Sequence, residues 1–224
     1  MRQLYLPMRI WDLPTRLFHW VLVVLIFISW LSAWREWMQV HVVCGLTVLT
    51  LLLFRLIWGL IGSDTARFSY FVKGPMAALR HLRHLLRREP DTETGHNAAG
   101  GWMVLVMLAL LFVQVGTGLC SNDDIDVEGP LAEYVGKARS DWLTHIHSVN
   151  FTLIEIAIAA HVIALITYRV LKGHNLLMPM ITGKKRLPGA TQAPRMMHPI
   201  LALAVLVFVA LAVLLSLLAI GYLP

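Results

Sequence analysis

Five long apolar runs constrain the fold of this chain more than any other feature of its sequence. They occupy about 17–34, 39–62, 98–120, 143–170 and 199–222. A transmembrane helix needs about 20 consecutive, mostly apolar residues, and each run has roughly that length. Only 14% of the residues are charged, whereas an ordinary soluble domain has about 25%. The sequence therefore predicts an all-α integral membrane protein with five spans in contact with lipid, and it excludes a water-soluble globule.

The distribution of basic residues predicts how the spans are oriented. Fifteen of the nineteen Lys and Arg residues lie in 1–16, 63–97 and 169–198, whereas the other two connections together carry three. Because Lys and Arg accumulate on the cytoplasmic side of the membrane, we expect the N-terminus in the cytoplasm of a bacterial cell. With five spans, the C-terminus is then periplasmic. This placement explains the net charge of +6 without nucleic-acid binding, which we do not expect.

Two connections carry further information. On the expected periplasmic side, the connection 121–142 is either a docking surface for a partner protein or simply a solvated loop. It contains six acidic residues: Asp123, Asp124, Asp126, Glu128, Glu133 and Asp141. On the expected cytoplasmic side, leucines and arginines take opposite helical faces at 79–87, after Gly74–Pro75. This second pattern predicts a short amphipathic helix on the inner membrane surface.

Four histidines lie inside apolar spans, where ionisable side chains are costly and call for a functional explanation. His19 is near the cytoplasmic end of the first span, and His41 is near the outer end of the second. The fourth span holds both His147 and His161, which are 14 residues apart. An α-helix rises about 1.5 Å and turns about 100° per residue, so these two lie on nearly the same face, roughly 21 Å apart.

Matching the histidines by depth pairs His41 with His147 on the outer side and His19 with His161 on the inner side. Imidazole is a common axial ligand of haem iron, and facing helices of a bundle can supply both ligands. Each pair is therefore a candidate site for one bis-His haem, which favours electron transfer and leaves no catalytic residue to assign. Any one of these histidines alone would more often be an interfacial or packing residue than a ligand.

Other metal centres are disfavoured by the lack of supporting ligands. Glu155 is the one carboxylate well inside a span, whereas a di-iron site needs several. The two cysteines, Cys44 and Cys120, form no zinc motif, and a disulfide between them is left open.

Arg55 is a further costly residue within a span. It follows His41 by 14 residues, so it lies on a similar helical face about 21 Å closer to the cytoplasm. A haem propionate or a quinone headgroup would accept its hydrogen bonds, while a guanidinium that reaches the inner lipid headgroups explains it equally well. Arg16 and Arg67 are additional candidates for the same cofactor-binding role.

The fifth span, 199–222, contains no charged residue and offers no ligand. We therefore expect a four-helix cofactor-binding bundle within 1–187 and an additional transmembrane helix within 188–224. Small residues in the other spans let helices or a flat cofactor approach closely, and we single out three: Gly45, Gly116 and Gly118.

A set of short motifs spread over residues 9–187 carries a family resemblance. The motifs are Arg9-Ile10-Trp11-Asp12, Arg16-Leu17-Phe18-His19-Trp20, His41 with Gly45, Phe54-Arg55-Leu56-Ile57-Trp58-Gly59, Gly62, Ala66-Arg67-Phe68, Gly95-His96-Asn97, His147, His161, Asn175-Leu176 and Met180-Ile181-Thr182-Gly183-Lys184-Lys185-Arg186. Together they resemble the prokaryotic cytochrome b561 family and, within it, the b-type cytochrome subunits that accompany nickel-iron hydrogenases and multihaem c-type cytochromes.

This resemblance implies a four-helix core that carries two b haems, and an electron-transfer subunit of the inner-membrane respiratory chain. Electrons would pass between a periplasmic redox partner, a c-type cytochrome or a hydrogenase docked at the outer face that includes 121–142, and quinone as an exchangeable substrate. The haem ligands carried over by position are the same four residues: His19, His41, His147 and His161.

Two hypotheses from other functional classes remain. A proton-coupled transporter could use the intramembrane histidines with Glu155 as a proton relay, although the odd number of spans and the absence of paired half-repeats disfavour it. Alternatively, the chain is a passive membrane anchor for a peripheral enzyme, and its histidines are incidental.

Overall fold

The computed structural model describes residues 4–83, 92–125 and 127–222, and it divides the chain into two compact units. Unit 1 comprises Met1–Leu17, Leu56–Val106 and Ala157–Ala202. Unit 2 comprises Phe18–Arg55, Met107–Ile156 and Leu203–Pro224. Asp126 of the acidic connection and 84–87 of the expected amphipathic helix lie outside the described residues.

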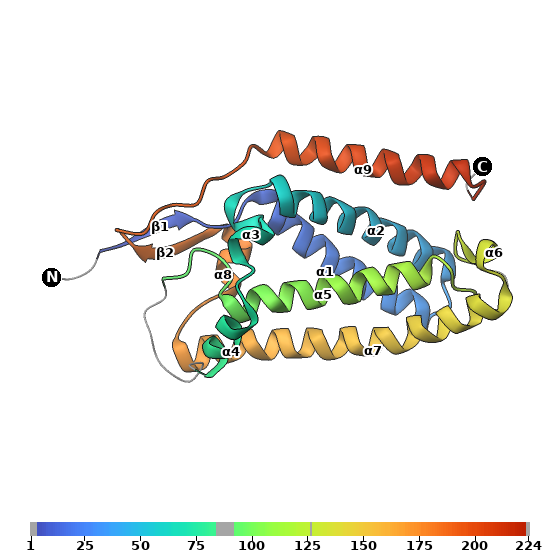
Figure 1. Ribbon diagram of the computed structural model, residues 1–224, viewed down its shortest axis with the longest axis horizontal. Helices are drawn as coiled ribbons and strands as arrows, with labels where there is room; N and C mark the ends of the chain where they lie inside the picture. The colour runs from blue at the N-terminus through green and yellow to red at the C-terminus, as the bar shows by residue number, and fades with distance from the viewer. Residues whose placement is uncertain (1–3, 84–91, 126, 223–224) are drawn as a thin grey trace. The chain divides into compact units, whose positions relative to one another are not determined.

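Within the described residues, five helices are long and apolar enough to cross a membrane (Figure 1). They are α1 (Leu13–Trp34), α2 (Met38–Ile61), α5 (Ala98–Gly118), α7 (Lys137–Thr167, continued by a π-helical turn at Tyr168–Lys172) and α9 (Pro199–Ala219). The predicted all-α membrane fold with five spans is confirmed. The largest difference is that α7 begins at Lys137 rather than near 143, because a helix can continue into polar residues that hydropathy assigns to a loop.

Unit 1 contains a two-stranded antiparallel ribbon that the sequence analysis did not predict. Its strands are β1 (Tyr5–Arg9) and β2 (Lys184–Pro188). Ile10, Trp11 and Leu187 form a small buried cluster next to the ribbon. Each strand has five residues of mixed polarity, so neither produces a clear alternating pattern, and the pairing joins segments from distant parts of the chain.

The remaining elements of unit 1 are short. They are a 3₁₀ turn (Asp64–Ala66), α3 (Phe68–Phe71), α4 (Pro75–Arg83) and α8 (Leu177–Thr182). The helix expected after Gly74–Pro75 is therefore present as α4. Ala78 on this helix is buried, whereas Leu79 and Arg80 are exposed.

Asp12 fixes the beginning of α1 within unit 1. Its side chain is buried, with 3% exposed. The backbone N–H of Thr15 donates to Asp12 Oδ1 at 2.8 Å, which is the hydrogen bond of a helix N-cap, and Trp58 Nε1 donates to Asp12 Oδ2 at 3.0 Å. One carboxylate therefore both starts α1 and attaches the end of α2 to it.

Unit 2 contains most of α1, α2 and α9, the second part of α5, the short helix α6 (Ala132–Val135) and the first part of α7. The chain that leaves α5 folds back on the end of that helix. The backbone N–H of Gly129 donates to Ser121 O at 2.8 Å, and that of Leu131 donates to Leu119 O at 2.7 Å. The described part of this connection therefore packs against the end of α5.

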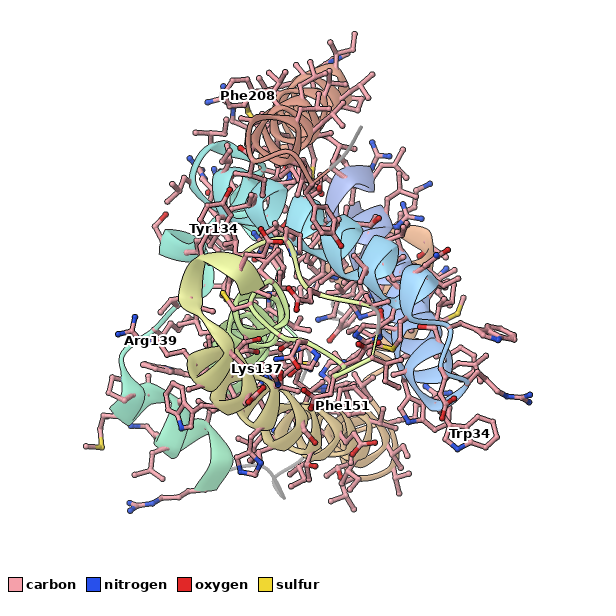
Figure 2. The ribbon with its side chains drawn as sticks, turned by 90° about the vertical axis from the view of Figure 1, so that its right-hand side faces the viewer. Trp34, Tyr134, Lys137, Arg139, Phe151 and Phe208 are labelled. Carbon is pink, nitrogen blue, oxygen red and sulfur yellow. The ribbon has the colours of Figure 1, made fainter. Side chains whose placement is uncertain are left out.

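The first turns of α7 hold the same connection from the other side. Asn122 Nδ2 donates to Ser140 Oγ at 2.6 Å and to Asp141 Oδ1 at 3.0 Å, and Lys137 forms ion pairs with Asp124 and Asp141. Lys137 at the start of α7 is labelled in Figure 2. Part of the acidic connection is thus neutralised within the protein.

Candidate functional site

Unit 2 contains a cavity of about 550 Å³, a volume typical of ligand pockets, which range over roughly 300–1,000 Å³. Its walls come from α1, α2, α5, α7 and the connection after α5. Apolar side chains such as Leu111 and Phe151 form much of the lining, and His41 and His147 are among its polar members. Figure 2 labels two lining residues, Trp34 on α1 and Phe151 on α7.

The imidazoles of His41 and His147 approach each other in this cavity. Their ring centroids are 6.0 Å apart, and their planes are inclined by 76°. Both side chains are half-buried. The structure therefore brings together the two histidines that the sequence paired by depth on the outer side.

Both rings are held at Nδ1 by a backbone carbonyl. His41 Nδ1 lies 2.9 Å from Ser29 O, and His147 Nδ1 lies 2.9 Å from Gln114 O. Because a carbonyl oxygen can only accept a hydrogen bond, Nδ1 carries the proton in each ring. In this tautomer Nε2 is the nitrogen that carries the lone pair of a neutral imidazole, and a neutral imidazole is the form that binds a metal.

A polar cluster beside His147 was missed by the sequence analysis. Thr117 Oγ1 lies 3.2 Å from His147 Nδ1, and Asn150 Nδ2 donates to Gln114 Oε1 at 2.7 Å and to Leu110 O at 2.9 Å. Thr117 and Asn150 are 7% and 5% exposed. Two features of the sequence could have predicted this cluster. Uncharged polar side chains are rare in these spans, and Asn150 follows His147 by about one helical turn.

Gly118 lies directly against the ring of His147. A Cβ added at Gly118 would be 2.9 Å from His147 Cε1 and 3.2 Å from His147 Nδ1, whereas Cβ atoms added at Gly45 and Gly116 would meet nothing within 4 Å. Gly45 and Gly118 both line the cavity. Of the three glycines expected to permit close approach, Gly118 is the one that does so against another helix.

The structure does not test the expected inner pair. His19 and His161 are both half-buried, but His19 belongs to unit 2 and His161 to unit 1, so their pairing stays a prediction. The ring of His19 packs edge-on against Trp20, with centroids 4.9 Å apart. Glu155, the residue of the transporter hypothesis, lines the cavity of unit 2.

The three candidate arginines have different surroundings. Arg55 is 3% exposed within unit 2. In unit 1, Arg16 donates hydrogen bonds to two backbone carbonyls of α8, and Arg67 forms an ion pair with Asp64. The chain itself therefore supplies acceptors for Arg16 and Arg67, and Arg55 differs from them in being almost fully buried.

Cys44 and Cys120 are both free thiols. Cys44 is buried. At Cys120, burial raises the pKa of the thiol above its ordinary value, which disfavours the reactive thiolate. Neither cysteine contributes to the cavity lining.

Comparison with protein families decides the class of this protein. A family model described as prokaryotic cytochrome b561 matches residues 10–183, more than three quarters of the chain. The chain belongs to the prokaryotic cytochrome b561 family. It is therefore a multi-pass membrane cytochrome of the b type that takes part in electron transfer. Comparisons with curated proteins and with solved structures found no match.

Membership of the cytochrome b561 family implies b-type haem, and the cavity of unit 2 fits such a group. Two imidazoles that are hydrogen-bonded through Nδ1, and so can present Nε2, are a suitable donor set for haem iron. The lining is largely apolar, and Gly118 leaves room beside the His147 ring. The cavity is therefore the candidate haem site of this cytochrome.

Proposed function

We propose that this cytochrome carries two b haems and transfers electrons across the bacterial inner membrane between a periplasmic redox partner and membrane quinone. The observation that carries the proposal is the approach of His41 and His147 in an apolar cavity, with both rings protonated at Nδ1. Bound haem supplies a one-electron Fe(III)/Fe(II) couple. Two imidazoles per iron would leave no open coordination position, which favours electron transfer over oxygen chemistry.

The ligand assignment follows the depth pairs. His41 and His147 hold the outer haem, and His19 and His161 hold the inner haem. The outer pair has the support of its geometry, and the inner pair rests on the similar depth of His19 and His161 in their spans. Both inner positions lie within the range that the family model matches.

Arg55 is the proposed anion-binding residue near the inner haem. A guanidinium that is 3% exposed within a membrane span is favoured where an anion or another acceptor meets it. A haem propionate or a quinone headgroup has that chemistry. Arg16 and Arg67 are further candidates for this role, and both are less buried than Arg55.

The orientation and the partner follow from charge. The excess of basic residues in 1–16, 63–97 and 169–198 supports a cytoplasmic N-terminus and a periplasmic C-terminus. The connection 121–142 then faces the periplasm, where a c-type cytochrome or a hydrogenase would dock. Residues 1–187 form the haem domain and 188–224 add one helix, in line with a family match that ends at residue 183.

Single substitutions at the outer pair test the assignment. In detergent-purified protein, His41→Ala and His147→Ala should each reduce the haem content from about two to about one per chain, measured by pyridine haemochrome. His145→Ala is the matched control, because His145 is exposed on α7 and is not among the cavity residues. Full retention of two low-spin haems in His147→Ala would refute the assignment.

A further inference from the structure

The two imidazoles of the outer site differ in the number of oxygen atoms close to Nδ1. His41 has one backbone acceptor, Ser29 O, at 2.9 Å. His147 has Gln114 O at 2.9 Å and a second oxygen, Thr117 Oγ1, at 3.2 Å. The Nδ1 proton of His147 therefore has two oxygens within reach, whereas that of His41 has one.

Gln114 is itself fixed at both its carbonyl and its side chain. Its carbonyl accepts from His147 and lies 3.0 Å from the Thr117 hydroxyl, whose shorter hydrogen bond, at 2.7 Å, goes to Val113 O. Its Oε1 accepts from Asn150 Nδ2 at 2.7 Å, and the same amide nitrogen donates to Leu110 O at 2.9 Å. Asn150 thus reaches from α7 to two points on α5 that lie one helical turn apart, and one of them is the side chain of Gln114, whose backbone carbonyl accepts from His147.

The setting makes these bonds costly to lose. Asn150 is 5% exposed, and the surrounding span is apolar. No water is available in the membrane interior to replace a missing partner, so a polar group left without one is strongly disfavoured. The hydrogen bonds of the Asn150 amide offset the cost of burying it, and they join α7 to α5 in one particular arrangement.

We propose that Asn150 is a positioning residue of the outer haem site, which acts through Gln114 to hold the imidazole plane of His147 nearly perpendicular to that of His41. This inference rests on the proposed function, because it takes His147 as a haem ligand. Outer partners of a ligating histidine set its ring orientation and basicity, and hydrogen bonding around the ligands is one of the means by which a protein tunes haem iron. The angle of 76° is the geometric quantity that the cluster maintains.

The angle has a spectroscopic signature. The anisotropy of the low-spin ferric electron paramagnetic resonance signal depends on the relative orientation of the two axial imidazole planes. Nearly perpendicular planes give a strongly anisotropic signal, and nearly parallel planes give a less anisotropic one. A loss of ring orientation at His147 therefore changes this signal even where the haem stays bound.

The test compares Asn150→Leu, which keeps the size of the side chain and removes its hydrogen bonds, with Thr152→Val as the matched control. Thr152 is an exposed polar residue on the same helix and is not among the cavity residues. In Asn150→Leu, the strongly anisotropic signal should shift or broaden, the midpoint potential of one haem should change, and that haem should dissociate about 10–100-fold more readily. Thr152→Val should match the wild type in all three measurements.

Two further variants separate positioning from general loss of structure. Asn150→Gln keeps the amide donor, so its electron paramagnetic resonance signal should differ less from that of the wild type than the signal of Asn150→Leu does. Gln114→Leu should shift the same signal, and the double variant should change it no more than the larger single change, because both residues act on one ring. A wild-type signal and potential in Asn150→Leu would overturn the proposal.

Failure of the inference can be distinguished from failure of the proposed function. If His147→Ala removes one haem and Asn150→Leu leaves the signal and the potential of that haem unchanged, His147 is a ligand and the Asn150 inference is wrong. If His147→Ala retains both haems with unchanged spectra, the ligand assignment itself is wrong, and the inference falls with it.

Discussion

At Gly118 the absence of a side chain allows α5 to approach His147. The ring of His147 cannot easily move aside, since its Nδ1 is bonded to Gln114 O and lies 3.2 Å from Thr117 Oγ1. An added methyl group would meet Cε1 of that ring at 2.9 Å, inside ordinary contact distance. The position of one imidazole thus depends on one missing Cβ atom.

Gly118→Ala should therefore displace the His147 ring and weaken haem binding at the outer site. We expect a reduced haem content and an altered low-spin spectrum in purified protein. Gly116→Ala is the control, because its Cβ would meet nothing within 4 Å, and alanine favours a helix over glycine by about 1 kcal/mol. Equal haem content and equal spectra in the two variants would contradict this account of Gly118.

The residues of the outer site were predictable to different degrees. His41 and His147 could be paired from depth alone, because imidazoles stand out in an apolar span. Their acceptors, Ser29 O and Gln114 O, could not be found in this way, since every residue carries a backbone carbonyl and only the packing of the helices decides which one is within reach.

Asp12 fixes the first turn of α1 within unit 1. It caps α1 through Thr15 and accepts a hydrogen bond from Trp58 on α2. The neighbouring Trp11 packs against the ring of His96, with centroids 4.7 Å apart. Part of the motif Arg9-Ile10-Trp11-Asp12 thus has a structural explanation within unit 1.

Asp12→Ala should lower the stability of unit 1. Loss of an N-cap costs about 0.5–2 kcal/mol, and loss of a buried acceptor costs about 1–3 kcal/mol more. Thermal unfolding in detergent should register a clearly lower midpoint for Asp12→Ala. Asp12→Asn keeps one side-chain acceptor and should fall between this variant and the wild type, and an unchanged midpoint in Asp12→Ala would show that the cap contributes little.

At the level of elements, hydropathy predicted the long helices and missed the ribbon. The five spans were located because burial in lipid demands long apolar runs. Strands β1 and β2 depend on pairing between Tyr5–Arg9 and Lys184–Pro188, a long-range contact that no local pattern reveals. The early start of α7 at Lys137 was missed because its first turns are polar.

For the whole molecule, the sequence predicted a five-span membrane cytochrome, and both the helices and the family match confirm that class. Composition predicted the membrane class, whereas the positions of the histidines predicted haem. His147 and His161 are 14 residues apart, a spacing that places both on nearly the same face of one helix. Haem number, partner and orientation are proposals that rest on His19, His161 and the distribution of charge.

Haem per polypeptide is the measurement that tests the central claim most directly. Pyridine haemochrome on detergent-purified protein, together with a reduced-minus-oxidised spectrum, should give about two b haems per chain, both low-spin. One haem per chain would contradict the assignment of one of the two depth pairs. A chain without haem would contradict the electron-transfer account as a whole.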